Sequence, residues 1–226
     1  MIKHLKTLLR GEVDARCLEK PNLRWFIGYC IAIVLGSSVY GATIGLWRAP
    51  LQSVFTAIKF PLLIFLTCIG NGAINGMLAQ VLGSDLSFRQ TAVAILMSFA
   101  IASLILGGFS PITLFILYNA PPLGSDHAIV GHSVMLLLHV FVIAFAGIVA
   151  NRRLFGLLQK VRGHDRTARA VLSSWLAGNL FLGAQLAWNL RPFIGSPTLA
   201  IQFLRDDPLR GNFYEAVWRA FLHLIT

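Results

Sequence analysis

The stretch WFIGYCIAIVLGSSVYGATIGL, from Trp25 to Leu46, decides the fold class of this chain. It carries no charged side chain, and Trp47 and Arg48 follow it directly. A spanning helix needs about 20 predominantly apolar residues, because the hydrocarbon core is about 30 Å thick and each helical residue rises about 1.5 Å. The stretch therefore predicts a transmembrane helix.

Four further apolar stretches follow the first one along the chain. They run from Leu51 to Leu82, from Thr91 to Tyr118, from His132 to Ala150 and from Val171 to Leu190. Antiparallel neighbours joined by short loops form a bundle, since irregular backbone facing lipid is not tolerated. The sequence therefore predicts an all-α, polytopic membrane bundle of five transmembrane helices.

We expect three regions along the chain. Residues 1–23 form a cytoplasmic basic amphipathic tail, residues 24–190 form the five-span domain, and residues 191–226 form an extramembrane segment with a second short amphipathic helix. In that last segment, Asn212 and Glu215 have the spacing of a helix N-cap and its partner. About 14 residues are too short to span, so the helix packs on the bundle, on a second subunit or in the headgroup layer; we favour packing on protein.

The composition of the whole chain agrees with a membrane location. Its 226 residues are 56% hydrophobic and 12% charged, with a mean hydropathy of +0.71, whereas about a quarter of the residues in an average soluble domain are charged. This excludes a soluble fold, a disordered chain and a coiled coil. In a membrane protein, the net charge of +10 indicates topology and contact with anionic lipid, rather than nucleic acid.

The distribution of basic residues predicts the orientation. Residues 1–24 hold six Lys and Arg, and so does the loop between the fourth and fifth predicted spans, whereas residues 119–131 hold none. Basic residues gather on the cytoplasmic side. We therefore expect a multi-pass membrane protein with a cytoplasmic N-terminus and an external C-terminus. Arg152 and Arg153, in the basic loop, are candidate contacts for anionic lipid.

Two predicted spans contain irregular positions. Lys59 and Pro61 lie in the second stretch, and a lysine at mid-bilayer costs about 2.5 kcal/mol or more. One interpretation starts the span near Phe60, with a short interfacial helix over residues 50–58 and Lys59 snorkelling to the interface; the other makes Lys59 buried and functional. In the third stretch, the sequence from Gly107 to Pro111 is expected to bend or break the helix.

Amide side chains are the polar groups of the second and fifth predicted spans. They are Asn71, Asn75, Gln80, Asn179, Gln185 and Asn189. Small residues lie beside them, so one interpretation is close packing of these two spans with amides bonded across the contact. The other is a polar path or cavity, because neutral amides ligate ions or polar solutes without a fixed charge. In the first span, Gly36, Gly41 and Gly45 favour a tight helix interface.

Catalytic chemistry is not expected. The five predicted spans contain no Asp or Glu, and the chain has neither the H-E-x-x-H nor the G-x-S-x-G motif. We predict that the protein is not an enzyme and has no cofactor or metal site. Arg191, directly after the fifth span, either caps that helix or contacts a lipid phosphate or another anion. His139 is expected to be hydrogen-bonded between helices.

The region from Ala49 to Leu190 resembles the bacterial Yip1-like membrane proteins. The similarity rests on a span that ends in Leu82-Gly83-Ser84, on the opening Ser87-Phe88-Arg89-Gln90-Thr91 of the next span, and on a late proline in it. The resemblance implies five spans, a cytoplasmic N-terminus, a location in the bacterial inner membrane and no enzymatic activity. The C-terminal segment resembles the C-termini of uncharacterised bacterial membrane proteins. No site residue is carried over from either resemblance.

Three functions follow from these observations. The first is a non-enzymatic, Yip1-like scaffold or accessory subunit that forms homo-oligomers and does not bind nucleic acid. The second is a homo-oligomeric channel or facilitator whose polar path is lined by amides of the second and fifth spans. The third is a lipid-binding or lipid-handling protein in which Lys59 or Arg191 contacts the headgroup.

Overall fold

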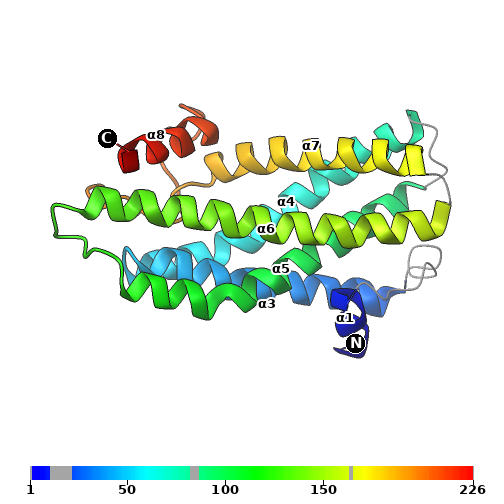
Figure 1. The fold of residues 1–226 in the computed structure, drawn as a ribbon, viewed down its shortest axis with the longest axis horizontal. Coiled ribbons are helices and arrows are strands. Elements are labelled where there is room, and N and C mark those ends of the chain that lie inside the picture. The colour runs from blue at the N-terminus through cyan, green and yellow to red at the C-terminus, as the bar shows by residue number, and fades with distance from the viewer. Residues whose placement is uncertain (1, 11–21, 82–86, 163–164, 226) are drawn as a thin grey trace.

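The computed structural model describes residues 2–10, 22–81, 87–162 and 165–225. Long helices lie side by side in one bundle, with no strand among these residues (Figure 1). The helices are α1 (Ile2–Arg10), α3 (Leu23–Leu46), α4 (Pro50–Val81), α5 (Phe88–Tyr118), α6 (Ala128–Arg162), α7 (Asp165–Asn189) and α8 (Phe213–Ile225). The predicted all-α helical bundle is confirmed.

Four of these helices are long and apolar enough to cross a membrane. The qualifying stretches are Leu23–Leu46, Pro50–Met77, Phe88–Tyr118 and Ala128–Gly156, which is compatible with a multi-pass membrane protein. The helix α7 has 25 residues but is less apolar than the other four. Part of the N-terminal tail, residues 11–21, and the Leu82-Gly83-Ser84 motif lie outside the described residues.

The helix α3 packs closely against both α4 and α5. Its glycines make this possible. A Cβ atom at Gly36 would collide with the backbone carbonyl of Ser103 on α5, and one at Gly41 would lie 2.7 Å from the carbonyl oxygen of Thr56 on α4. The expected role of these glycines in a tight interface is therefore confirmed.

Two buried hydrogen bonds join α3 to its other neighbours. The Tyr40 hydroxyl lies 2.8 Å from His139 Nδ1 on α6, so the expected hydrogen bond of this histidine between helices is confirmed. The Thr43 and Thr113 hydroxyls lie 2.9 Å apart, between α3 and α5. A hydroxyl or ring nitrogen loses its hydrogen bond to water when it is buried. These bonds are favourable because they replace the one that is lost.

Two expected interruptions of helices are absent. The helix α4 is continuous from Pro50 through Pro61, so the prediction of a separate interfacial helix over residues 50–58 is wrong. The helix α5 is likewise continuous through Pro111, so of the bend or break expected there the break is absent. A proline removes one intrahelical hydrogen bond, and packing against neighbouring helices can hold the turns on either side of it.

The last helix, α8, packs on the bundle, as favoured among the three alternatives. It begins after Asn212, whose side-chain oxygen accepts a hydrogen bond from the Glu215 backbone N–H at 2.9 Å. It contacts α6 and the end of α7, and Ala220 is its buried residue. Figure 1 shows α8 beyond the C-terminal end of α7, alongside the beginning of α6.

Candidate functional site

Residues 190–212, here called the joining segment, connect α7 to α8 without regular structure. The segment begins where α7 ends, and it lies against the first turns of α4. Three polar residues of α4 meet it: Gln52, Thr56 and Lys59, all with no exposed surface. Their spacing of four and three residues places them on one face of the helix.

Lys59 is the most unusual residue of this contact. Its Nζ atom donates hydrogen bonds to the carbonyl oxygens of Leu190 at 3.1 Å and Phe203 at 2.8 Å. A third, short hydrogen bond reaches the carbonyl oxygen of Pro192. The ring centroids of Phe193 and Phe203 lie 5.1 and 5.4 Å from Nζ. Of the two interpretations of Lys59, the structure therefore shows burial within the protein; the snorkelling interpretation is wrong.

Two other α4 residues extend this contact along the joining segment. The Thr56 hydroxyl donates to the carbonyl oxygen of Phe193 at 2.6 Å. The Gln52 amide donates to the carbonyl oxygens of Pro192 at 2.9 Å and Phe193 at 3.0 Å. This stretch of backbone is buried and not helical, so its carbonyl oxygens need donors from outside regular secondary structure. Side chains of α4 supply these donors.

A tight turn brings the joining segment close to the beginning of α4. Gly195 has a φ of +87°, and a Cβ atom there would lie 2.8 Å from Cγ of Arg48. The Arg48 guanidinium donates to the carbonyl oxygen of Leu199 at 3.3 Å. A glycine is required here both by the left-handed conformation and by the close approach.

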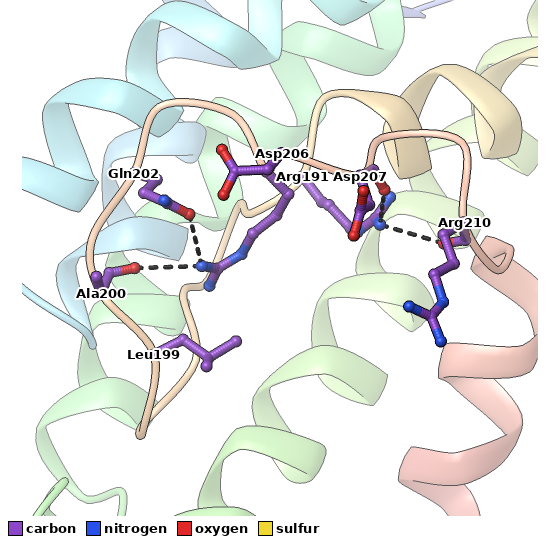
Figure 2. Close-up of a pocket in the computed structure, with 8 residues that line it drawn as sticks. Arg191, Leu199, Ala200, Gln202, Asp206, Asp207 and Arg210 are labelled. Carbon is purple, nitrogen blue, oxygen red and sulfur yellow. Dashed lines mark hydrogen bonds between the residues drawn. The ribbon is translucent and has the colours of Figure 1, made fainter.

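Arg191 contacts the later part of the joining segment, residues 207–210 (Figure 2). Its guanidinium lies 4.0 Å from the Trp188 ring centroid and donates to backbone carbonyl oxygens at the end of α7 and in residues 207–210. The acceptors are Trp188 at 3.0 Å, Pro208 at 2.8 Å, Asp207 at 2.5 Å and Arg210 at 3.2 Å. The bond to Trp188 fits the helix-capping interpretation, and the other three attach residues 207–210 to the end of α7.

A hollow of about 490 Å³ lies beside Arg191. Arg205 enters it and donates to the Ala200 carbonyl oxygen at 3.3 Å and to Gln202 Oε1 at 2.9 Å (Figure 2). Burial and the positive charge of Arg205 lower the pKa of Arg191, while Asp207 raises it. Arginine remains charged at physiological pH, since its ordinary pKa is far above neutrality.

The amides of α4 form a second polar cluster. Asn71 and Asn75 are fully buried, and Asn75 Nδ2 lies 3.4 Å from Asn71 Oδ1. Both face Gly178 of α7, where a Cβ atom would lie 3.0 Å from Asn71 Oδ1 and 3.5 Å from Asn75 Oδ1. The helices α4 and α7 pack together, as expected for the second and fifth apolar stretches.

Several polar atoms of this cluster are buried without a hydrogen-bond partner. They are Asn71 Nδ2, Asn75 Oδ1, Asn179 Oδ1 and Trp175 Nε1. Trp175 lies one turn before Gly178 on α7. An unsatisfied buried polar atom costs about 1–3 kcal/mol, and ordered water or a polar ligand is the usual partner for such an atom. This cluster is therefore a candidate polar cavity.

The remaining predicted residues whose side chains the structure describes do not join either cluster. Gln185 and Asn189 are half-buried on α7, and Gln80 belongs to α4 with its side chain outside the described part. Arg152 and Arg153 are exposed on α6, and the Arg153 guanidinium donates to the Arg10 carbonyl oxygen at 2.9 Å.

Sequence reasoning missed the partnership between α4 and the joining segment. Its signal was the spacing of Gln52, Thr56 and Lys59, polar residues at i, i+4 and i+7 in the first turns of a predominantly apolar helix. It also missed a second hollow of about 620 Å³ between α6, α7 and α8, lined among others by His132, Arg219 and His223.

The comparisons with known proteins assign no family. The chain matches no protein-family model, no curated protein and no solved structure. The resemblance to Yip1-like proteins therefore stays a prediction, and the function has to be argued from the geometry.

Proposed function

We propose that this chain is a non-enzymatic membrane protein of the Yip1-like type that acts as a homo-oligomeric scaffold or accessory subunit. Five helices cross the bacterial inner membrane in this proposal: α3, α4, α5, α6 and, as the fifth, α7. The N-terminus is cytoplasmic and the C-terminus external. Short amphipathic helices at both ends lie outside these five spans.

The observation that carries the proposal is how the cations of Lys59 and Arg191 are used. Lys59 and Arg191 donate to carbonyl oxygens of the chain itself, whereas a catalytic or transport site would keep such groups open to a substrate. Their role is to hold the joining segment, and with it α8, on the bundle. Because these side chains fix the joining segment and α8 in place, the surface that the two form is suited to binding a partner.

The topology of the bundle supports the proposed orientation. The beginning of α3 and the end of α6, which border the two basic segments, lie at one end of the bundle, and the end of α5 lies at the other (Figure 1). Both basic segments can therefore face the anionic cytoplasmic leaflet together.

The surface available to a second copy is the outer face of α8. Trp218 is 60% exposed and Phe221 44% exposed, and their rings stack with centroids 5.7 Å apart. Exposed aromatic pairs of this kind are enriched at protein interfaces.

Replacing both Trp218 and Phe221 by glutamine is expected to convert the homo-oligomer into a monomer, because the aromatic contact area is lost. Native mass spectrometry of the protein released from nanodiscs measures this change. The matched control is Leu209→Gln, at a residue 82% exposed in the joining segment, which should leave the oligomer intact. A wild-type protein that is monomeric at all concentrations would contradict the oligomeric scaffold.

A second candidate function is supported by the unpartnered amides between α4 and α7. Buried Asn71, Asn75 and Asn179 atoms without partners suit a channel or facilitator for small polar solutes, which would supply the missing hydrogen bonds in passing. A lipid-handling role has less support, because the Arg191 donors are bound to the chain itself.

Replacing Asn75 by leucine is expected to abolish any solute flux, because the side chain keeps its volume but loses its hydrogen-bonding atoms. Flux of glycerol, urea and monovalent ions into liposomes containing the purified protein measures this. The exposed amide variant Asn119→Leu is the control and should conduct as the wild type does. Absence of flux in the wild-type protein for every solute would exclude the facilitator and leave the scaffold.

A further inference from the structure

Three carbonyl oxygens of the joining segment converge on one buried point. They belong to Leu190, Pro192 and Phe203, residues that come together because the segment leaves the end of α7 and later returns to it. The return is fixed by a backbone hydrogen bond, 3.3 Å from the Arg205 N–H to the Arg191 carbonyl oxygen.

The groups that contact Lys59 Nζ are electron-rich, and among the described residues no carboxylate contacts it. Carbonyl oxygens accept hydrogen bonds but donate none, and the carbonyl of Leu190 directly follows a helix C-terminus, where the partial charge is negative. The rings of Phe193 and Phe203 add their faces at 5.1 and 5.4 Å from Lys59 Nζ, and such faces attract a cation.

The number and kind of these groups select one class of cation. A primary ammonium has three N–H donors and no acceptor, so it satisfies three carbonyl oxygens at once. A divalent metal prefers six or more oxygen ligands with carboxylates among them, which the recorded Lys59 contacts do not include. A guanidinium is planar and cannot direct three donors around one point.

We propose that the carbonyl oxygens of Leu190, Pro192 and Phe203, with the rings of Phe193 and Phe203, form a primary-ammonium binding site whose built-in occupant is the Lys59 side chain. The site belongs to the joining segment, and α4 supplies the ligand. This inference goes beyond the proposed function, because it holds for a scaffold and for a facilitator alike.

The proposal predicts that a free amine can replace the lysine. In Lys59→Ala, the missing atoms, from Cγ to Nζ, correspond to n-propylammonium. We expect the variant to unfold at a lower temperature than the wild type, and n-propylammonium to raise its unfolding temperature with saturation. At about 100 times the dissociation constant, the ratio of folded to unfolded protein should rise about 100-fold.

The controls separate recognition of the ammonium from filling of a cavity. 1-Propanol has the same length but no charge, and tetramethylammonium has the charge but no N–H donor; neither should stabilise Lys59→Ala. Lys59→Met, in which the cavity is filled, should not respond to n-propylammonium. Equal stabilisation by 1-propanol and n-propylammonium would overturn the proposal, as would a folded Lys59→Ala protein that no amine stabilises.

A variant that does not fold alone still tests the site. Lys59→Ala is then extracted from membranes of cells grown with n-propylammonium or with 1-propanol in the medium, and the monodisperse protein is measured by size-exclusion chromatography. A yield raised by the amine alone supports the site. A yield raised by both compounds, or by neither, contradicts it.

Discussion

Lys59→Met is expected to lower the free energy of unfolding by about 3 kcal/mol and to release the joining segment from α4. Methionine retains the length of the lysine stem, so the effect does not come from a cavity. It comes from the carbonyl oxygens of Leu190, Pro192 and Phe203, which lose a donor that has no exposed surface in the fold. Each buried, unsatisfied polar group costs about 1–3 kcal/mol, while removing the buried charge offsets part of the sum.

Two measurements test this expected loss of stability and release of the joining segment. Unfolding by denaturant in detergent micelles gives the change in free energy, and limited proteolysis within residues 190–212 reports the release of the segment. Lys6→Met is the matched control, because Lys6 is exposed on α1; it should leave both measurements unchanged. An unfolding free energy equal to that of the wild type would show that the joining segment does not depend on Lys59.

Gly36→Ala is expected to destabilise the bundle by about 1–3 kcal/mol, because the added methyl group meets the Ser103 backbone of α5 and not a flexible side chain. The direction is informative, since alanine in place of glycine favours an isolated helix by about 1 kcal/mol. A net loss of stability can therefore come only from the contact between α3 and α5, where Gly107 also approaches Gly36, at 3.1 Å from its would-be Cβ to the Gly36 Cα.

The control for this prediction lies on the opposing helix. A Cβ atom at Gly108 meets nothing within 4 Å, so Gly108→Ala should leave the stability unchanged or raise it slightly. Denaturant unfolding of both variants in the same detergent measures the difference. Equal stability of the Gly36→Ala and Gly108→Ala proteins would mean that the two helices are not held at the close distance that the glycines permit.

The helices themselves could be predicted from the sequence, because hydropathy is a local property. The apolar stretches beginning at Trp25, Thr91 and His132 each correspond to one long helix. The ends of the first two are displaced by three residues at most, whereas the third helix runs from Ala128 to Arg162, well beyond the predicted end at Ala150. The capping box of α5, with Ser87 and Gln90 bonded reciprocally, lies within the opening that the resemblance singled out. The helix interruption expected at Lys59 is absent. A lysine in an apolar stretch does not indicate which groups will surround it in the fold.

The amide cluster was partly predictable. Asparagine beside glycine in two apolar stretches indicated that the second and fifth stretches meet, and Asn71 and Asn75 do face Gly178. The pattern did not indicate which amides remain half-buried, as Gln185 and Asn189 do. Burial of a side chain depends on how its helix is rotated about its own axis. A helix that is apolar nearly all round has no polar face to fix that rotation.

The sequence by itself determined that this protein is a bundle of apolar helices in which charge is kept to the ends, because helix formation and hydropathy depend on neighbouring residues along the chain. Only the tertiary structure decided the role of Lys59. Its partners are backbone carbonyls more than 130 residues away, and every residue carries such a carbonyl. A carbonyl cluster therefore leaves no signature in the sequence and exists only once the joining segment has folded against α4.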